Sequence, residues 1–344
     1  MKAGSMRDTL TFDDVLLTPK YSEIKSRSEI SLSTSVPKAQ HLNIPIISSP
    51  MDTVTETEMV VAMAISGGLG IIHRYNTIED QMNIVGTARK MLPSNVSVGA
   101  AIGVSGDFVQ RAEALYDEGA DVLCVDIAHG HHVLMKEALQ ALRASLGDSV
   151  HLMAGNVATL KAFNDLADWG ADSIRVGVGG GSICSTRVMT GHGVPTLQSV
   201  IDCSKSDRNA LLIADGGIKQ TGDVVKAIAA GADLVMLGSM LAGTDESPGE
   251  TFYVDGVKSK SYRGMASASA QIDWRGHVAS EEGVSHRVSV KGPVVKTLES
   301  IEKALRSGMS YSGAANIIEF QAKADMIRIT QASLVESKPH IFQR

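Results

Sequence analysis

The chain has 344 residues, of which 44% are hydrophobic and 20% are charged, and its formal net charge is −6. This composition is typical of a globular protein and argues against disorder along the whole chain and against a nucleic-acid binder. The first residues lack the apolar run of a signal peptide, and no apolar stretch reaches the roughly 18 residues of a membrane span. The three cysteines are too few and too scattered for a disulfide framework or a CxxC metal site. We therefore expect a reduced, cytoplasmic protein.

Eight short segments rich in β-branched or apolar residues recur along the chain, and each ends in glycine or a polar residue. Their starts are about 20 to 40 residues apart, which leaves room for a strand, a helix and two loops. The expected strands are Ile44–Met51, Leu69–His73, Val96–Gly103, Val122–Ala128, His151–Val157, Ser173–Gly177, Leu211–Gly216 and Leu234–Gly238.

Segments between these strands have the apolar spacing of helices, most clearly Asp107–Gly119 and Thr221–Gly231. Gly119, Gly170 and Gly231 stand where a glycine ends a helix, and each is followed by Ala-Asp. The reuse of Gly-Ala-Asp before the fourth, sixth and eighth expected strands indicates one structural unit repeated along the chain.

Continuous apolar strands that alternate with helices predict a parallel sheet covered on its outer face. Eight such units predict a closed (β/α)8 barrel of the α/β class that forms a single domain over residues 1–344, and the alternative is a doubly wound open sheet. A barrel carries its active site in the loops at the carboxyl ends of its strands. Candidate residues at those ends are Asp126, Asn156, Asp215, Gly216, Gly217, Gly238 and Ser239.

The glycine-rich segment Gly177–Arg187, here called the cysteine loop, follows the sixth expected strand. Its glycines allow backbone N–H groups to approach an anion closely, and Ser182 adds a hydroxyl. Positive dipoles at such a place would stabilise the thiolate of Cys184, as nucleophilic catalysis requires. The alternative is a tight turn with a small buried cysteine. Cys124 and Cys203, in a strand and a helix, are expected to be inert.

The segments Ile213–Gly217 and Met236–Ser239 end the seventh and eighth strands, where barrels usually bind phosphate. Asp215 could then accept hydrogen bonds from ribose hydroxyls, although turn chemistry alone is an alternative explanation. The histidine cluster His129–His132 has no cysteine or carboxylate at ligand spacing, so it is interpreted as loop or helix-start residues and not as a metal site.

Together these segments resemble the IMP dehydrogenase and GMP reductase family, and the resemblance runs nearly from end to end. It implies an enzyme of purine metabolism that acts on a purine nucleotide, GMP or IMP, with a nicotinamide cofactor. The motifs that carry it are Thr11–Leu17, Ser49–Glu56, Asp126–Gly130, Ala154–Val157, Gly181–Arg187, Ala214–Gly217, Tyr262–Met265 and Leu305–Met309.

The resemblance implies a role for each matching residue. Cys184 would attack C2 of the purine to form a covalent adduct, and Thr186 and Glu282 would transfer protons at that carbon. Asp126 and Gly177 would contact the cofactor. The substrate nucleotide would be held by Met51, Ser182, Asp215, Gly217, Gly238, Ser239, Tyr262, Gly264, Met265 and Gly283.

The resemblance also implies a monovalent cation, expected to be potassium, and a homotetramer. The cation would be held by carbonyl groups of Gly179, Gly181 and Cys184. The C-terminal segment of a neighbouring subunit, here around Glu336, would complete that metal site.

The sequence departs from the family pattern in several places. Gly180 stands where proline is usual and Ser185 where threonine is usual, and both changes could loosen the cysteine loop. The regulatory tandem domain of many dehydrogenases is absent, because only a few residues separate Lys90 from Val96. In the mobile flap, about residues 255–292, the dehydrogenases have an adjacent Arg-Tyr pair whose arginine activates water, whereas Arg275 is followed here by Gly276.

Two reactions are compatible with the shared covalent adduct. A dehydrogenase oxidises IMP with NAD and water to XMP, and a reductase converts GMP and NADPH into IMP, ammonia and NADP. The missing Arg-Tyr pair, the short flap and the absent regulatory domain favour the GMP reductase. The segments Glu282–Val284, Lys291–Pro293 and Ala332–His340 resemble a dehydrogenase. A catalytically inactive nucleotide-binding scaffold is a third hypothesis, which the intact Cys184, Thr186 and Asp215 disfavour.

Overall fold

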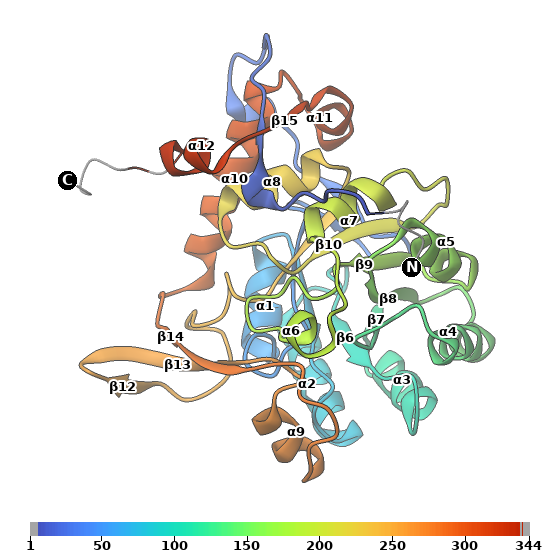
Figure 1. Cartoon of the computed structure of the whole chain (residues 1–344). Helices are drawn as coiled ribbons and strands as arrows, with labels where there is room; N and C mark the ends of the chain where they lie inside the picture. Colours follow the sequence, from blue (N-terminus) through green and yellow to red (C-terminus); the bar gives the residue numbers. More distant parts are fainter. Residues whose placement is uncertain (1–5, 338, 340–344) are drawn as a thin grey trace.

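Eight parallel strands close into a barrel in the computed structural model, which describes residues 6–337 and 339 (Figure 1). Each observed strand lies within one of the eight expected segments, so the barrel prediction is confirmed. The last strand pairs with the first, with Val235 opposite Ile46, which excludes the open sheet. The strands are β4 (Ile46–Ser48), β5 (Leu69–Ile72), β6 (Gly99–Ile102), β7 (Val122–Asp126), β8 (His151–Val157), β9 (Ser173–Val176), β10 (Leu211–Asp215) and β11 (Leu234–Leu237).

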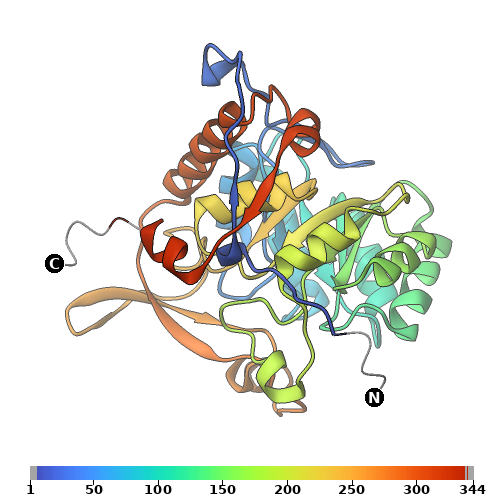
Figure 2. The same ribbon diagram turned by 45° about the horizontal axis from the view of Figure 1, so that its top comes forward.

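Helices surround the barrel in chain order (Figure 2). The place of the eighth helix is taken by α10, which packs against both α8 and α1 and so completes the ring. The surrounding helices are α1 (Thr57–Ile65), α2 (Ile78–Met91), α3 (Phe108–Asp117), α4 (Val133–Leu146), α5 (Leu160–Asp168), α7 (Thr196–Cys203), α8 (Thr221–Ala229) and α10 (Val294–Tyr311).

The repeated Gly-Ala-Asp sequence has one structural role at all three places. Each glycine follows a helix with a positive φ, between 102° and 109°, as a left-handed helix end requires. Each aspartate then exchanges hydrogen bonds with a residue near the start of the preceding strand. Asp121 accepts from the N–H of Val98 at 3.0 Å, and equivalent bonds join Asp172 to Leu152 (2.8 Å) and Asp233 to Leu212 (2.7 Å). The repeat therefore attaches each returning chain to the sheet.

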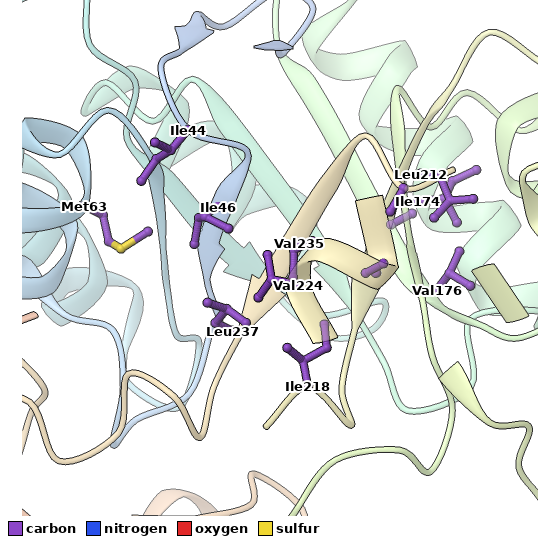
Figure 3. Packing of buried hydrophobic residues seen from close by; sticks show 14 of the residues in the cluster. Ile44, Ile46, Met63, Ile174, Val176, Leu212, Ile218, Val224, Val235 and Leu237 are labelled. Carbon is purple, nitrogen blue, oxygen red and sulfur yellow. The ribbon is translucent and has the colours of Figure 1, made fainter. Parts of the chain in front are cut away.

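The apolar core has two parts. The larger part fills the layer between the barrel and the helices, where Figure 3 shows side chains of β4, β9, β10 and β11 together with Met63 of α1 and Val224 of α8. The smaller part fills the barrel itself with side chains such as Ile47, Ile71 and Met236. A packed interior restricts a ligand site to one of the two barrel ends.

A short hairpin covers the amino-terminal end of the barrel. Its strands are β2 (Thr34–Ser35) and β3 (His41–Leu42), and Val36 and Leu42 join the apolar residues inside the barrel. The Pro37 carbonyl lies 2.7 Å from Nδ1 of His151, the first residue of β8, which attaches the hairpin to the strand starts. The carboxyl end of the barrel is therefore the open one.

The segment between β11 and α10 forms a separate antiparallel sheet that contains the expected flap. Its strands are β12 (Phe252–Val254), β13 (Val257–Arg263) and β14 (Ser285–Ser289), and α9 (Ala268–Arg275) lies between the last two. These strands, drawn in orange, extend away from the barrel in both ribbon views. The flap is thus an insertion placed after the last barrel strand.

The remaining described elements are short and lie near the two ends of the chain or in the cysteine loop. Residues 1–5, used for the expectation about a signal peptide, and residues 338 and 340 of the tail motif lie outside the described residues. The N-terminal β1 pairs antiparallel with β15 near the C-terminus. These elements are η1 (Phe12–Asp14), β1 (Val15–Leu17), η2 (Arg27–Glu29), α6 (Thr186–Thr190), α11 (Ile317–Lys323), β15 (Met326–Arg328) and α12 (Gln331–Glu336).

Candidate active site

A cavity of about 310 Å³ opens at the carboxyl ends of the barrel strands and is bordered by the flap. Every residue that the sequence analysis proposed for the site lines it, except Glu336, which ends α12 and is not among the lining residues. The lining residues from that set are Met51, Asp126, Asn156, Gly177, Gly179, Gly181, Ser182, Cys184, Thr186, Asp215, Gly216, Gly217, Gly238, Ser239, Tyr262, Gly264, Met265, Glu282 and Gly283.

A thiol, a hydroxyl and a carboxylate form a hydrogen-bonded chain in this cavity. The exposed thiol of Cys184 lies 3.2 Å from Oγ1 of Thr186, and that hydroxyl donates to Oε2 of Glu282 at 2.7 Å. A hydroxyl between two ionisable groups can pass a proton from one to the other. The arrangement therefore suits catalysis in which the cysteine acts as a nucleophile and the neighbouring hydroxyl transfers a proton to or from the substrate.

Backbone hydrogen bonds attach the cysteine loop to the flap. The N–H of Ser185 donates to the carbonyl of Glu282, and the N–H of Val284 donates to the carbonyl of Ile183, both at 3.0 Å. The position of the Glu282 carboxylate relative to Thr186 thus depends on the docked flap. These bonds also hold the loop at Ser185, one of the two positions where the sequence suggested a looser loop.

The other such position, Gly180, is explained by its neighbour Thr196, the first residue of α7. A Cβ atom on Gly180 would lie 2.4 Å from Oγ1 of Thr196, closer than real contacts allow. Thr196 is β-branched and only 4% exposed, so its hydroxyl has little freedom to move. Glycine at position 180 is therefore a packing requirement of this chain, in which Thr196 occupies the space that a larger residue would need.

A buried guanidinium group joins two carboxylates that line the cavity. Arg175, in β9, donates to Asp126 at 2.5 Å and to Asp215 at 2.9 and 3.1 Å. Asn156 adds a hydrogen bond to the same oxygen of Asp215 at 2.8 Å. Burial alone would lower the pKa of Arg175, but Asp215, Cys124 and Asp126 raise it well above its usual value. Arg175 thus stays charged and fixes both carboxylates.

Sequence reasoning missed Arg175, although a signal was present. It is the one charged residue in the apolar run of β9, and such a residue inside a packed barrel needs carboxylate partners. The carboxylates Asp126 and Asp215 both stand at strand ends. Their pairing with Arg175 could have been proposed once the barrel had been recognised.

Tyr262 closes the side of the cavity near the end of β11. A Cβ atom on Gly238 would lie 3.1 Å from the Tyr262 hydroxyl and 3.2 Å from the sulfur of Met51, so these three residues are close neighbours. Burial raises the pKa of Tyr262 to about 12, with Ser182 opposing that effect through a hydrogen bond. At neutral pH the hydroxyl is therefore protonated and can donate to an anion.

An aromatic stack connects the flap to the β5–α2 loop at the Asp126 side of the cavity, and sequence reasoning did not find it. The rings of Tyr75 and Trp274 are 4.3 Å apart and nearly parallel, at 11°. Arg74 lies over both rings, at 5.5 and 5.6 Å, and its Nε is 3.6 Å from Asp126. The stack holds α9 of the flap against the barrel.

Cys124 and Cys203 are both buried, as expected for inert cysteines, and lie in β7 and α7. Burial raises the pKa of each thiol to about 12, so both are protonated at neutral pH and are poor nucleophiles. Cys184 is the exposed cysteine of the three.

The histidine cluster forms local contacts. His131 lies 2.7 Å from Asp165, and His132 is the N-cap of α4, where its Nδ1 accepts from the N–H of Leu134 at 3.1 Å. Among residues 6–337 and 339, no group of three or more His, Cys, Asp or Glu side chains is arranged to hold a metal ion. In the same part of the chain, no helix is both long and apolar enough to cross a membrane.

Comparison with known proteins identifies the family of the chain. The family model described as IMP dehydrogenase / GMP reductase domain matches residues 9–340. Inosine-5′-monophosphate dehydrogenase of Nitrosopumilus maritimus is 35% identical, over 97% of this chain and 98% of its own length. GMP reductase of Leishmania major is 34% identical, over 98% and 97% of the two chains.

A solved structure is similar over almost the whole fold. It is a variant of GMP reductase from Trypanosoma brucei in complex with guanosine 5′-monophosphate, with a TM-score of 0.94, 33% identity, and coverage of 98% of this chain and 99% of that one. The fold and the site together define a (β/α)8-barrel oxidoreductase of purine metabolism. The chain belongs to the IMP dehydrogenase / GMP reductase family, whose enzymes use a nicotinamide cofactor.

Proposed function

We propose that this protein is a GMP reductase that converts GMP and NADPH into IMP, ammonia and NADP. The proposal rests on the position of the Arg275 side chain, which lies outside the cavity. Its guanidinium donates to Gln271 and lies 5.8 Å from the Trp274 ring centre, and it is not among the residues that line the cavity. The dehydrogenase reaction needs a group that removes a proton from water beside the adduct. The Cys184–Thr186–Glu282 chain instead offers a proton donor for a leaving amine.

The proposed reaction begins at the purine. The Cys184 thiolate bonds to C2 of GMP, and the C2–N bond breaks as the amine leaves as ammonia. The proton that the Cys184 thiol gives up passes through Thr186 to the Glu282 carboxylate, and Thr186 then returns it to the leaving amine. Asp126 and Gly177 would hold the nicotinamide cofactor, which would supply a hydride at C2. Cleavage of the C2–S bond would then release IMP and the free thiolate. Asp215 would hold the ribose of the nucleotide. The purine would be contacted by Met51, Gly264, Met265 and Gly283, and the phosphate would be held by Ser182, Gly217, Gly238, Ser239 and Tyr262.

Asp126 and Gly177 would hold the cofactor. The polar wall beside Asp126 fits this role, because Nε of Arg74 is buried and has no hydrogen-bond partner among the described residues. A polar ligand would supply that partner. NADP(H) is the proposed cofactor for the reductase, and NAD for the alternative reaction.

An IMP dehydrogenase is the second candidate. Relatives with both names match at nearly the same identity, 35% and 34%. For that reaction Arg275 would have to leave Gln271 and enter the cavity. The third hypothesis, an inactive nucleotide-binding scaffold, requires that neither reaction occurs.

The deciding experiment compares GMP with NADPH and IMP with NAD, using the parent protein, Glu282→Gln and Arg275→Ala. We expect turnover of GMP, a decrease of roughly 10²- to 10⁴-fold for Glu282→Gln, as for loss of a positioned acid, and little change for Arg275→Ala. Brisk oxidation of IMP that Arg275→Ala stops would establish the dehydrogenase instead. Absence of both activities would establish the scaffold.

A monovalent cation, proposed to be potassium, and a homotetramer extend this proposal. The carbonyl groups of Gly179, Gly181 and Cys184 belong to one loop, and the Gly181 carbonyl accepts from the Cys184 N–H at 3.1 Å. Since Glu336 does not line this chain's own cavity, a second copy would have to supply it. Deletion of residues 333–344 should lower both activity and its dependence on potassium. An unchanged response to potassium, or a monomer by light scattering, would refute this extension.

A further inference from the structure

Two lysines of the inserted segment bind the back of the loop that follows β11, here called the phosphate loop (residues 238–247). Lys291 donates to the carbonyl groups of Ser239 at 2.7 Å and Met240 at 3.3 Å. Its own N–H donates to the carbonyl of Gly243 at 2.9 Å. The segment that leaves the flap is thus attached to this loop by both its backbone and its ammonium group.

Lys260, in β13, binds the other end of the same loop. Its ammonium group donates to three carbonyl groups, those of Thr244 at 3.1 Å, Asp245 at 3.0 Å and Ser247 at 2.7 Å. The residue is only 6% exposed. All three donors of the ammonium are used, and the carbonyl groups surround it as they would surround a bound monovalent cation.

The contact with Lys291 orients a peptide group of the loop. In a trans peptide the C=O and the following N–H point in opposite directions. Because the Ser239 carbonyl faces Lys291, the N–H of Met240 points away from that lysine. Among the described residues, neither this N–H nor that of Ser239 has an acceptor. Ser239 lines the cavity, whereas Met240 and Lys291 are not among its lining residues, so the side of the loop opposite Lys291 is the one that faces the cavity.

The two ammonium groups also place positive charge behind the loop. No carboxylate of the described residues lies within ion-pair distance of Lys260 or Lys291. Carbonyl partners leave the net charge of each lysine unchanged. Two cations without a direct carboxylate partner, behind a loop with free N–H groups, favour a bound dianion.

We propose that Lys291 and Lys260 are positioning residues that orient and charge the phosphate loop for the 5′-phosphate of the nucleotide. This inference rests on the proposed function, in which a purine nucleotide binds with its phosphate at Gly238 and Ser239. It also links the flap to substrate binding, because both lysines come from the inserted segment.

The test compares a nucleotide with its nucleoside. Calorimetry would measure GMP, IMP and guanosine binding to the full-length parent protein and to Lys291→Met, Lys291→Arg and Lys260→Met. Lys258→Met is the matched control, because Lys258 is exposed on the same strand as Lys260. For Lys291→Met we expect roughly 10- to 100-fold weaker nucleotide binding, the size of a lost charge-assisted contact, with guanosine binding within twofold of the parent. Lys291→Arg should recover most of the affinity.

Equal losses for nucleotide and nucleoside would show a general structural role and overturn the inference, as would unchanged GMP binding in both methionine variants. A second measurement does not depend on the proposed function: the increase in the thermal unfolding temperature that inorganic phosphate causes in each protein. If the parent protein bound neither nucleotide, the proposed function would fail. Loss of the phosphate effect in Lys291→Met but not in Lys258→Met would still support the role of the loop.

Discussion

Arg175→Met should destabilise the fold strongly, because it leaves two carboxylates without their shared cation. The side chain of Arg175 is 7% exposed, and those of Asp126 and Asp215 are 21% and 13% exposed. Removal of one partner from a buried ion pair typically costs about 3–5 kcal/mol. Both carboxylates line the cavity and can bind water there, so we expect the lower end of that range, about 3 kcal/mol.

Arg208→Met is the matched control. Arg208 also contacts two carboxylates, Asp168 at 2.8 Å and Asp207 at 2.5 Å, but its side chain is 39% exposed. Exposed ion pairs contribute about 0–1 kcal/mol, because water and salt screen them. The number of partners is therefore the same in both variants, and burial is what differs.

The assay is unfolding by urea at neutral pH, followed by circular dichroism, with nucleotide binding measured in parallel. Arg175→Met should shift the midpoint well below that of Arg208→Met and weaken nucleotide binding, since Asp215 would lose its fixed position. Equal midpoints for the two variants would refute the argument from burial. A stable Arg175→Met protein with full nucleotide affinity would show that Asn156 alone can hold Asp215.

Further predictions concern packing, the flap and pH. Gly180→Ala should lower the free energy of unfolding by about 1–3 kcal/mol through overpacking. The double variant Gly180→Ala with Thr196→Ala should recover most of that loss in thermal unfolding. A double variant without recovery would contradict the 2.4 Å contact between a Cβ atom at position 180 and Oγ1 of Thr196. Trp274→Ala should speed proteolysis of the flap, because a stacked pair contributes about 0.5–1.5 kcal/mol, whereas cleavage at the parent rate would show that the stack does not hold α9. Burial tends to raise the pKa of Asp172, but hydrogen bonds from Lys38, Leu152 and Arg143 lower it overall. The stabilising effect of the Asp172 carboxylate should therefore be complete at neutral pH and be lost as the pH falls below the ordinary carboxyl range. The unfolding free energies of Asp172→Asn and the parent should then converge in acid. A difference between them that stays constant with pH would contradict the lowered pKa.

The sequence by itself determined the barrel. Each of the eight strands is a continuous apolar run because both of its faces are buried, and such runs can be recognised locally. The Gly-Ala-Asp repeat and its helix-ending glycine were also recognised from the sequence, whereas the hydrogen bonds of its aspartate were found only in the structure. Most residues of the candidate site were also predicted, because barrel topology brings strand ends together and the motifs matched a known family.

Contacts between distant segments were decided only by the tertiary structure. The requirement for glycine at position 180 depends on Thr196, and the fixed position of Asp215 depends on Arg175, one strand away. The stack of Tyr75 on Trp274 joins residues 199 positions apart in sequence. The carbonyl groups that receive Lys260 and Lys291 leave no trace in the residue types, because every residue has a carbonyl. Only the folded backbone determines which carbonyl groups converge on one ammonium group.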